Sequence, residues 1–381
     1  MKRLILLVLG FLCWQGVVLA KDYFYVTALE DSVCVIVENN SMQFSFDGEE
    51  WNDFQCEEYD GVSVLKLYLD GNWKKMNKVG YTTIGDILYA EEEEHLEMRN
   101  EIFLDLSVKY IYADKPNYKV LPCCILLEKG QKLFFKGNGT YEWTRGKHNY
   151  IQSAMLRVSD VELYYDDYVF PYPHIPIYFG RKNKFEVGGE LMSLVDGEWS
   201  DSTKIERQAF LAMFAESAVA DASNLKLPTE LSDECFAYMF YKCESLQNAP
   251  ELPATNLKDG CYAAMFSNCE SLEKAPNLPA EKLESLSYIK MFSNCSSLNY
   301  INVLSKEVIS EDVIYRWVDG VSTTGEFIAK NQYCEDLEPC LPVGDWNVVC
   351  LNEKPKEESK EEESKDSRRD TTINGIYYKL T

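Results

Sequence analysis

One octapeptide, written three times with small changes, constrains the fold more than any other feature of the chain. MFYKCESL begins at Met239, MFSNCESL at Met265 and MFSNCSSL at Met291, so the spacing is 26 residues each time. The same step holds for further columns: Leu231/Leu257/Leu283, Phe240/Phe266/Phe292, Cys243/Cys269/Cys295 and Leu246/Leu272/Leu298, with a weaker copy at Ala209, Met213, Phe214 and Ser217. A period in the 20s is typical of a solenoid, in which each unit buries its apolar face against its neighbours. We therefore expect the repeated side chains to form a continuous interior.

Each unit combines two periodicities. Cys261, Met265 and Cys269 are four residues apart, which predicts one apolar helical face of about three turns. The following stretch, SLEKAPNLP, contains Pro276 and Pro279, which exclude helix and favour a short extended segment. Each coil is therefore predicted to be a short helix, a turn and a short strand.

The cysteine column has two interpretations. Cys243, Cys269 and Cys295 are expected near the starts of successive strands, roughly 4.8 Å apart, which is within disulfide range. Three cysteines cannot all pair, so we expect buried thiols that act as small apolar side chains. A zinc site needs closely spaced pairs such as CxxC, and the spacing of eight within a unit offers none, so no metal site is predicted.

The repeat pattern CYxxMFxxCxSLxxAPxLPAxxL, read from Cys261, resembles the BspA-like leucine-rich-repeat surface proteins that Bacteroidales export. Residues 40–54, 126–140 and 189–200 are similar to the β-rich module that precedes such repeats, and residues 298–331 resemble the family's closing segment. The resemblance implies a leucine-rich-repeat horseshoe fragment, an extracellular or surface location, and binding rather than catalysis. The stretch from about Gln55 to Leu121 has no counterpart in it.

The segments before the repeats alternate β-branched and aromatic residues with polar ones. Five of them predict strands: DYFYVTAL, SVCVIVEN, SMQFSFD, VSVLKLYLD and QKLFFKG. The expected fold class is therefore α+β, with an antiparallel, sandwich-like β-rich domain over residues 21–196 and a short leucine-rich-repeat β/α solenoid over residues 197–303. Residues 304–350 are predicted to cap the repeats, 351–372 to be a charged linker, and 373–381 to begin a further module or to be a truncated end.

The chain begins MKRLILLVLGFLCWQGVVLA, in which two basic residues precede an apolar run that ends in small residues. This layout predicts a secretory signal peptide over residues 1–20, with an uncleaved anchor as the alternative. No other stretch approaches the roughly 20 apolar residues of a spanning helix. We expect a secreted or cell-surface protein with no membrane span after signal cleavage.

The charge of the chain argues against nucleic acid as a partner. The formal net charge is −24, and removing Lys2 and Arg3 with the signal peptide makes it −26. A balance this acidic repels phosphate backbones.

Motifs for catalysis are absent from the sequence. His95, His148 and His174 stand in unrelated contexts, and neither GxSxG nor HExxH occurs. Asp166 and Asp167 would point to opposite faces of a strand, which spoils a glycosidase-like carboxylate pair. No catalytic residue and no cofactor are predicted, and the protein is not expected to be an enzyme.

The leading hypothesis is binding of a protein or glycan ligand, including a host-derived one, at or near the bacterial surface. Stacked coils place their variable strand positions in columns on one face. The candidate ligand-binding residues are Asn248, Glu251, Lys274, Asn277, Tyr300 and Asn302, with Gln247, Glu273 and Asn299 beside them.

Several alternatives stay open. The candidate positions are equally consistent with ordinary solvated polar residues. The chain would then be a structural spacer that carries another module, or a glycan-acting enzyme built on residues 55–121. The aromatic stretch 161–185 fits either core packing or stacking against a ligand. The sequence predicts no oligomeric state.

Overall fold

The computed structural model describes residues 22–31, 33–37, 40–58, 65–76, 82–84, 87–89, 120–121, 123–137, 177–197, 205–281, 283–304, 311–330, 341–351, 371–373 and 376–380. Several sequence predictions lie outside these residues: the signal peptide, the three histidines, Asp166 and Asp167, most of 55–121, most of the aromatic stretch 161–185, and most of the charged linker. Within the described ranges, no helix has the length and apolar character needed to span a membrane.

The predicted α+β class, with its leucine-rich-repeat β/α solenoid, is wrong. The structure is nearly all β, with 36% strand and 2% helix, and its sheets are mixed. Among the described residues, helix is limited to the four-residue elements α5 (Ser193–Asp196) and α6 (Glu311–Ile314). The helices expected in each repeat unit do not form.

Two sheets make up the N-terminal part of the chain. The first has the order β15-β14-β1-β12-β3-β4, and the second has the order β13-β2-β11-β6-β7. Most neighbours are antiparallel, but β14 pairs with β15 and β11 pairs with β6 in parallel. The bounds are β1 Phe24–Ala28, β2 Val33–Val37, β3 Met42–Ser45, β4 Asn52–Asp53, β6 Leu65–Leu69, β7 Asn72–Met76, β11 Cys123–Leu127, β12 Lys132–Gly137, β13 Ile177–Phe179, β14 Phe185–Glu190 and β15 Val219–Lys226.

Two short strand pairs lie beside these sheets. β5 (Glu57–Glu58) pairs with β10 (Val120–Leu121), and β8 (Thr82–Ile84) pairs with β9 (Ile87–Tyr89). The β5–β10 pair brings the two ends of the stretch 55–121 together.

Alternating burial explains the N-terminal core. In β1, Phe24, Val26 and Ala28 are buried while the residues between them are half-buried, which is the period of two of a strand with one core face. Every residue of β2 is buried. These side chains belong to one continuous core that runs through the repeats to Cys350.

Residues 205–304, which we call the repeat stack, are built from consecutive tight turns. Within one unit the N–H groups alternate between two kinds of acceptor. Met239 donates to the carbonyl of Phe236, three residues back, at 3.2 Å, whereas Phe236 donates to Cys261 in the next unit at 3.0 Å. An α-helix would instead bond every N–H to the carbonyl four residues back.

The backbone of the repeat stack also enters the left-handed region at every fourth residue. Glu234, Tyr238 and Lys242 have φ of 54°, 58° and 56°. The spacing of four that predicted a helix is therefore real, but the element that repeats is a four-residue run of turns. Its alternating bonds satisfy the backbone partly within a unit and partly between units.

The prediction that the repeated side chains form the interior is confirmed. The Met, Phe and Cys columns and the Leu246/Leu272/Leu298 column are buried, and in the remaining leucine column only Leu283 is partly exposed. Phe214, Phe240, Phe266 and Phe292 stack at centroid distances of 5.1, 5.6 and 5.7 Å. A second ladder continues through Phe236, Tyr262 and Tyr288 to Trp317.

The cysteine column is buried as predicted, and its thiols also make hydrogen bonds. The Sγ atoms of Cys243, Cys269 and Cys295 donate to the carbonyls of Phe214, Phe240 and Phe266 at 2.9, 3.0 and 3.0 Å. Each of these bonds joins one unit to the preceding one.

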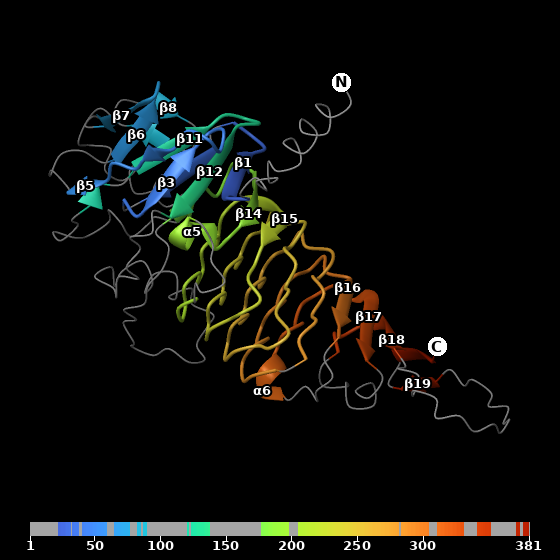
Figure 1. The fold of residues 1–381 in the computed structure, drawn as a ribbon. Coiled ribbons are helices and arrows are strands. Elements are labelled where there is room, and N and C mark those ends of the chain that lie inside the picture. Colours follow the sequence, from blue (N-terminus) through green and yellow to red (C-terminus); the bar gives the residue numbers. More distant parts are fainter. Residues whose placement is uncertain are drawn as a thin grey trace, which may run out of the picture.

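A mostly parallel sheet closes the other end of the stack (Figure 1). β16 (Tyr300–Val303), β17 (Thr324–Lys330), β18 (Asp345–Leu351) and β20 (Ile376–Leu380) pair in parallel, and β19 (Thr371–Ile373) pairs antiparallel with β20. Figure 1 shows the N-terminal sheets at one end of the molecule, the stack between, and this sheet at the far end. One side of the molecule, which we call the strand-lined side, therefore runs from β14 and β15 through isolated bridges in the repeat units to β16, β17 and β18.

Candidate functional site

The strand-lined side of the stack carries two rows of side chains, and each row takes one residue from each successive unit. Bridges between parallel segments join Asp221 to Asn248 and Lys274 to Tyr300. Tyr300 then pairs with Glu326, and Glu326 with Asn347. The first row is defined as Asp221, Asn248, Lys274, Tyr300, Glu326 and Asn347.

Asp221 is held rigidly at the start of the first row. Its carboxylate accepts hydrogen bonds from the Ser223 backbone N–H at 2.8 Å and from the Ser223 hydroxyl at 2.6 Å. The side-chain amide of Asn248 donates to its other oxygen at 2.7 Å. This end of the row is therefore a fixed carboxylate with an adjacent amide.

The second row lies two or three residues further along each strand. The Asn302 side-chain amide donates to Asn277 Oδ1 at 2.9 Å, and Glu251 stands one repeat before Asn277 and is exposed. In the sheet that follows, Asn302 pairs with Ile328 and Ile328 with Val349, both half-buried. We define the second row as Glu251, Asn277, Asn302, Ile328 and Val349. It changes from polar to apolar along its length.

All six candidate residues thus lie on one side, and contacts join four of them in pairs. Lys274 neighbours Tyr300, and Asn277 bonds to Asn302. Asn248 contacts Asp221, which the sequence reasoning did not select. The sequence did carry a signal for two further residues, because Glu326 and Ile328 lie one step of 26 after Tyr300 and Asn302.

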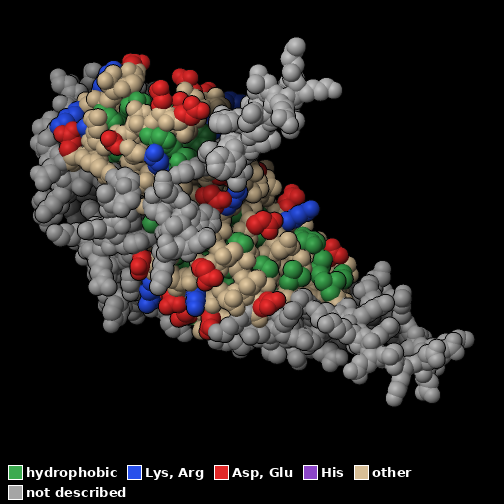
Figure 2. Space-filling view, in the orientation of Figure 1, with side chains coloured by type: hydrophobic (Ala, Val, Ile, Leu, Met, Phe, Trp, Pro, Cys, Tyr) green, Lys and Arg blue, Asp and Glu red, His purple; other side chains and the backbone are tan. Residues whose placement is uncertain are grey.

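The charge of this side is acidic with a single basic position. Among the residues of the two rows, Lys274 carries the only positive charge, and Asp221, Glu251 and Glu326 are acidic. Figure 2 shows red side chains outnumbering blue ones over the visible part of the stack. The rows therefore offer many acceptors, several amides, one aromatic ring and one cation.

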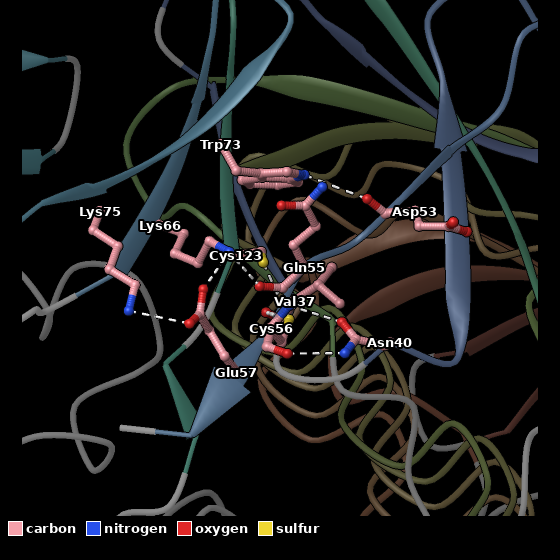
Figure 3. Close-up of polar contacts among 10 residues, drawn as sticks. All are labelled: Val37, Asn40, Asp53, Gln55, Cys56, Glu57, Lys66, Trp73, Lys75 and Cys123. Atoms are coloured by element: carbon pink, nitrogen blue, oxygen red, sulfur yellow. Dashed lines mark hydrogen bonds and ion pairs between the residues drawn. The ribbon is translucent and has the colours of Figure 1, made fainter. Parts of the chain in front are cut away.

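A second polar cluster lies in the N-terminal part of the chain, around Lys66 (Figure 3). Its ammonium is buried, lies 2.5 Å from Glu57 and donates to the carbonyl of Gln55 at 2.8 Å. Lys75 lies 3.1 Å from the other Glu57 oxygen. Hydrogen bonds from Lys66 and then Lys75 hold the pKa of Glu57 below its ordinary value. The cluster is saturated by its own ion pairs, so we assign it a structural role.

The buried thiols of the stack are poor nucleophiles. Burial raises the pKa of Cys243, Cys261 and Cys295 to about 12, so each is protonated at neutral pH. In the part of the chain that the structure describes, no three His, Cys, Asp or Glu side chains are grouped to hold a metal ion.

Comparisons with known proteins found no matching family model, no matching curated protein and no matching solved structure.

Proposed function

We propose that this chain is an exported binding protein that uses the strand-lined side of the repeat stack to hold a protein or glycan ligand at or near the bacterial surface. The observation that carries the proposal is the pairing of Lys274 with Tyr300 in the middle of the first row. A cation next to an aromatic residue, with a carboxylate further along the row in each direction (Asp221 and Glu326), gives a ligand several different groups to contact.

The chemistry of the rows suits a ligand rich in hydroxyl and amide groups. Carboxylates accept hydrogen bonds, and asparagine amides both donate and accept them. A tyrosine ring offers a flat apolar face and a polar hydroxyl, which suits a sugar ring or a peptide side chain.

The resemblance of the repeats to BspA-like surface proteins supports the same proposal, because it implies export and binding. The predicted signal peptide over residues 1–20 agrees with that location. The acidic charge makes a polyanionic ligand unfavourable.

The test is an array of glycans and host proteins probed with residues 21–381. The parent chain is compared with the double variant Lys274→Ala/Tyr300→Ala. A matched control, Lys258→Ala/Tyr315→Ala, removes one exposed lysine and one exposed tyrosine that belong to neither row. We expect saturable binding that weakens at least about tenfold in the first variant, as for loss of two central contacts, and is unchanged in the control.

Binding that is equally weak in both variants would show that the ligand contacts another surface. No saturable binding to any ligand would favour the second candidate, a structural spacer. The observation behind that candidate is the continuous core that joins the N-terminal sheets, the repeat stack and β18.

A further inference from the structure

Cys56 and Cys123 lie in contact at the neck of the stretch 55–121. The Sγ atom of Cys56 lies 3.2 Å from the Sγ atom of Cys123 and 3.3 Å from the carbonyl oxygen of Val37 (Figure 3). A disulfide needs the two sulfur atoms at about 2.05 Å, so a shift of roughly 1 Å would join them.

The backbone of Cys56 is clamped in this position. The Asn40 side-chain amide donates to the carbonyl of Cys56 at 2.8 Å, and Asn40 Oδ1 accepts from the N–H of Cys56 at 2.8 Å. Lys66 fixes the preceding peptide through the carbonyl of Gln55. These hydrogen bonds therefore hold Cys56 in a position where its sulfur lies close to that of Cys123.

The two cysteines also differ in accessibility in a way that suits stepwise oxidation. Cys56 is half-buried, whereas Cys123 is fully buried in β11. An external oxidant can reach Cys56 first, and Cys123 is positioned to complete the reaction from inside. Elsewhere in the chain, Cys350 in β18 is disulfide-bonded, so this fold already contains an oxidised cysteine.

Another close pair shows that sulfur proximity alone is not sufficient. Cys34 and Cys124 have their Sγ atoms 3.1 Å apart, but Cys34 pairs with Leu126 and Cys124 with Ile36 in the β2–β11 ladder. They are diagonal neighbours, for which the Cα separation is roughly 7–8 Å, beyond the range that a disulfide spans without backbone movement. Both are also fully buried, so an oxidant cannot reach either.

We propose that Cys56 and Cys123 form a disulfide that closes the neck of the stretch 55–121. The Cys56 thiol loses its proton to solvent, and the thiolate attacks an external disulfide, such as oxidised glutathione. This step forms a mixed disulfide and releases one thiol. Cys123 then attacks the Cys56 sulfur, and its proton leaves with the second released thiol. Two protein thiols are oxidised, and one external disulfide is reduced to two thiols.

The topology gives this bond a clear role. β5 and β10 pair just inside the two cysteines, with Glu57 opposite Leu121 and Glu58 opposite Val120. A bond between Cys56 and Cys123 would lock this short pair, which has only two residues on each strand. The stretch 55–121 would then be a loop that is closed covalently where it leaves the two N-terminal sheets.

The first test maps the bond in residues 21–381 after treatment with oxidised glutathione. Free thiols are first alkylated under denaturing conditions. The disulfides are then reduced, and the thiols they release receive a second label that is read by peptide mass spectrometry. We expect the second label on Cys56 and Cys123 and the first label on Cys34 and Cys124. A first label on both Cys56 and Cys123, or a second label on Cys34 and Cys124 instead, would overturn the proposal.

Two variants test the order of the steps. Cys123→Ser should trap a glutathione adduct on Cys56, whereas Cys56→Ser should leave Cys123 without one because it is buried. Cys124→Ser is the matched control and should form the Cys56–Cys123 bond like the parent. An adduct on Cys123 in the Cys56→Ser variant would contradict the proposed order.

A gel gives an independent readout on the unmutated chain. One proteolytic cut between residues 59 and 119 should leave two fragments that migrate together in detergent without reductant and separate when reductant is added. Separation without reductant after oxidation would also overturn the proposal.

Discussion

Replacing Ala264 and Ala237 separately with glycine would distinguish the observed turns from the helices that the spacing predicted. Both side chains are on the turn side of the repeat stack and are 2% exposed. Only Ala264 has a positive φ, 50°, whereas Ala237 is not among the residues with left-handed backbones. The two substitutions therefore remove the same buried methyl group from different backbone conformations.

The expected effects follow from three contributions. Loss of the buried methyl costs about 0.8 kcal/mol, and the extra freedom of glycine in the unfolded chain costs about 0.4–1 kcal/mol. Both apply to either site. At Ala264 alone, glycine relieves left-handed strain of about 1–2 kcal/mol. We expect Ala237→Gly to lower the free energy of unfolding by about 1.5 kcal/mol and Ala264→Gly to change it by less than about 0.5 kcal/mol.

The measurement is urea unfolding of the parent and both variants, followed by circular dichroism, with midpoints compared at equal slopes. In an α-helix both alanines would have negative φ, and both glycines would cost the same amount. Equal losses in the two variants would therefore refute the turn geometry described for the stack.

Three further predictions test other parts of the structure. Glu57→Gln removes the carboxylate beside buried Lys66 and should cost about 1 kcal/mol at pH 7, allowing for the partial exposure of Glu57. Because folding lowers the pKa of Glu57, the ionised carboxylate stabilises the fold above its unfolded pKa of 4.5, and this stabilisation is lost as pH falls through the pKa in the folded protein. The urea midpoints of parent and variant should therefore converge in acid. Phe266→Ala should lower the free energy of unfolding in urea by about 3–5 kcal/mol. Phe46→Ala, at a side chain that is 41% exposed, should lower it by less than about 1 kcal/mol. Similar losses of stability in the two variants would contradict the stacked interior. Gly189→Ala should lower the thermal midpoint, because φ is 78° and the added methyl would overlap a backbone carbonyl of the neighbouring chain segment; an unchanged midpoint would contradict the close approach of these segments.

The period of 26 allowed the interior and the candidate side to be predicted from sequence. When a chain advances by one equal step per unit, residues one period apart become neighbours whatever the local backbone is. This is why the phenylalanine column is stacked and why Lys274 lies beside Tyr300. Periodicity fixes neighbours between units, and it does not fix the conformation within a unit.

The conformation within each unit was predicted wrongly for a physical reason. Apolar residues four apart fit both an α-helix and a run of four-residue turns. A partial distinguishing signal was present at four of the left-handed positions, which carry residues that tolerate positive φ: Gly260, Asn268, Asn294 and Gly320. The other left-handed positions carry residues such as Tyr238 and Leu286, which give no such signal. The sequence therefore did not separate the turns from a helix.

The parallel pairing of β14 with β15 could not be predicted, because it joins segments 34 to 36 residues apart through an irregular register. Its consequence is that the N-terminal sheet continues directly into the strand side of the stack. The same pairing accounts for Asp221, which lies 27 residues before Asn248 instead of 26. A search at a fixed step of 26 misses it.

The first row is long because the strand-lined side continues from β15 through the repeat units into the C-terminal sheet. The first row runs through six positions from Asp221 to Asn347, although only three units carry the octapeptide. At roughly 4.8 Å per strand the row spans about 24 Å, which is the length of about seven extended residues. Contacts in such a row are spread along its length, so a ligand that covers one position gains little of the available interaction. The arrangement therefore suits an extended chain, such as a polysaccharide or an unfolded peptide segment, better than a single compact molecule.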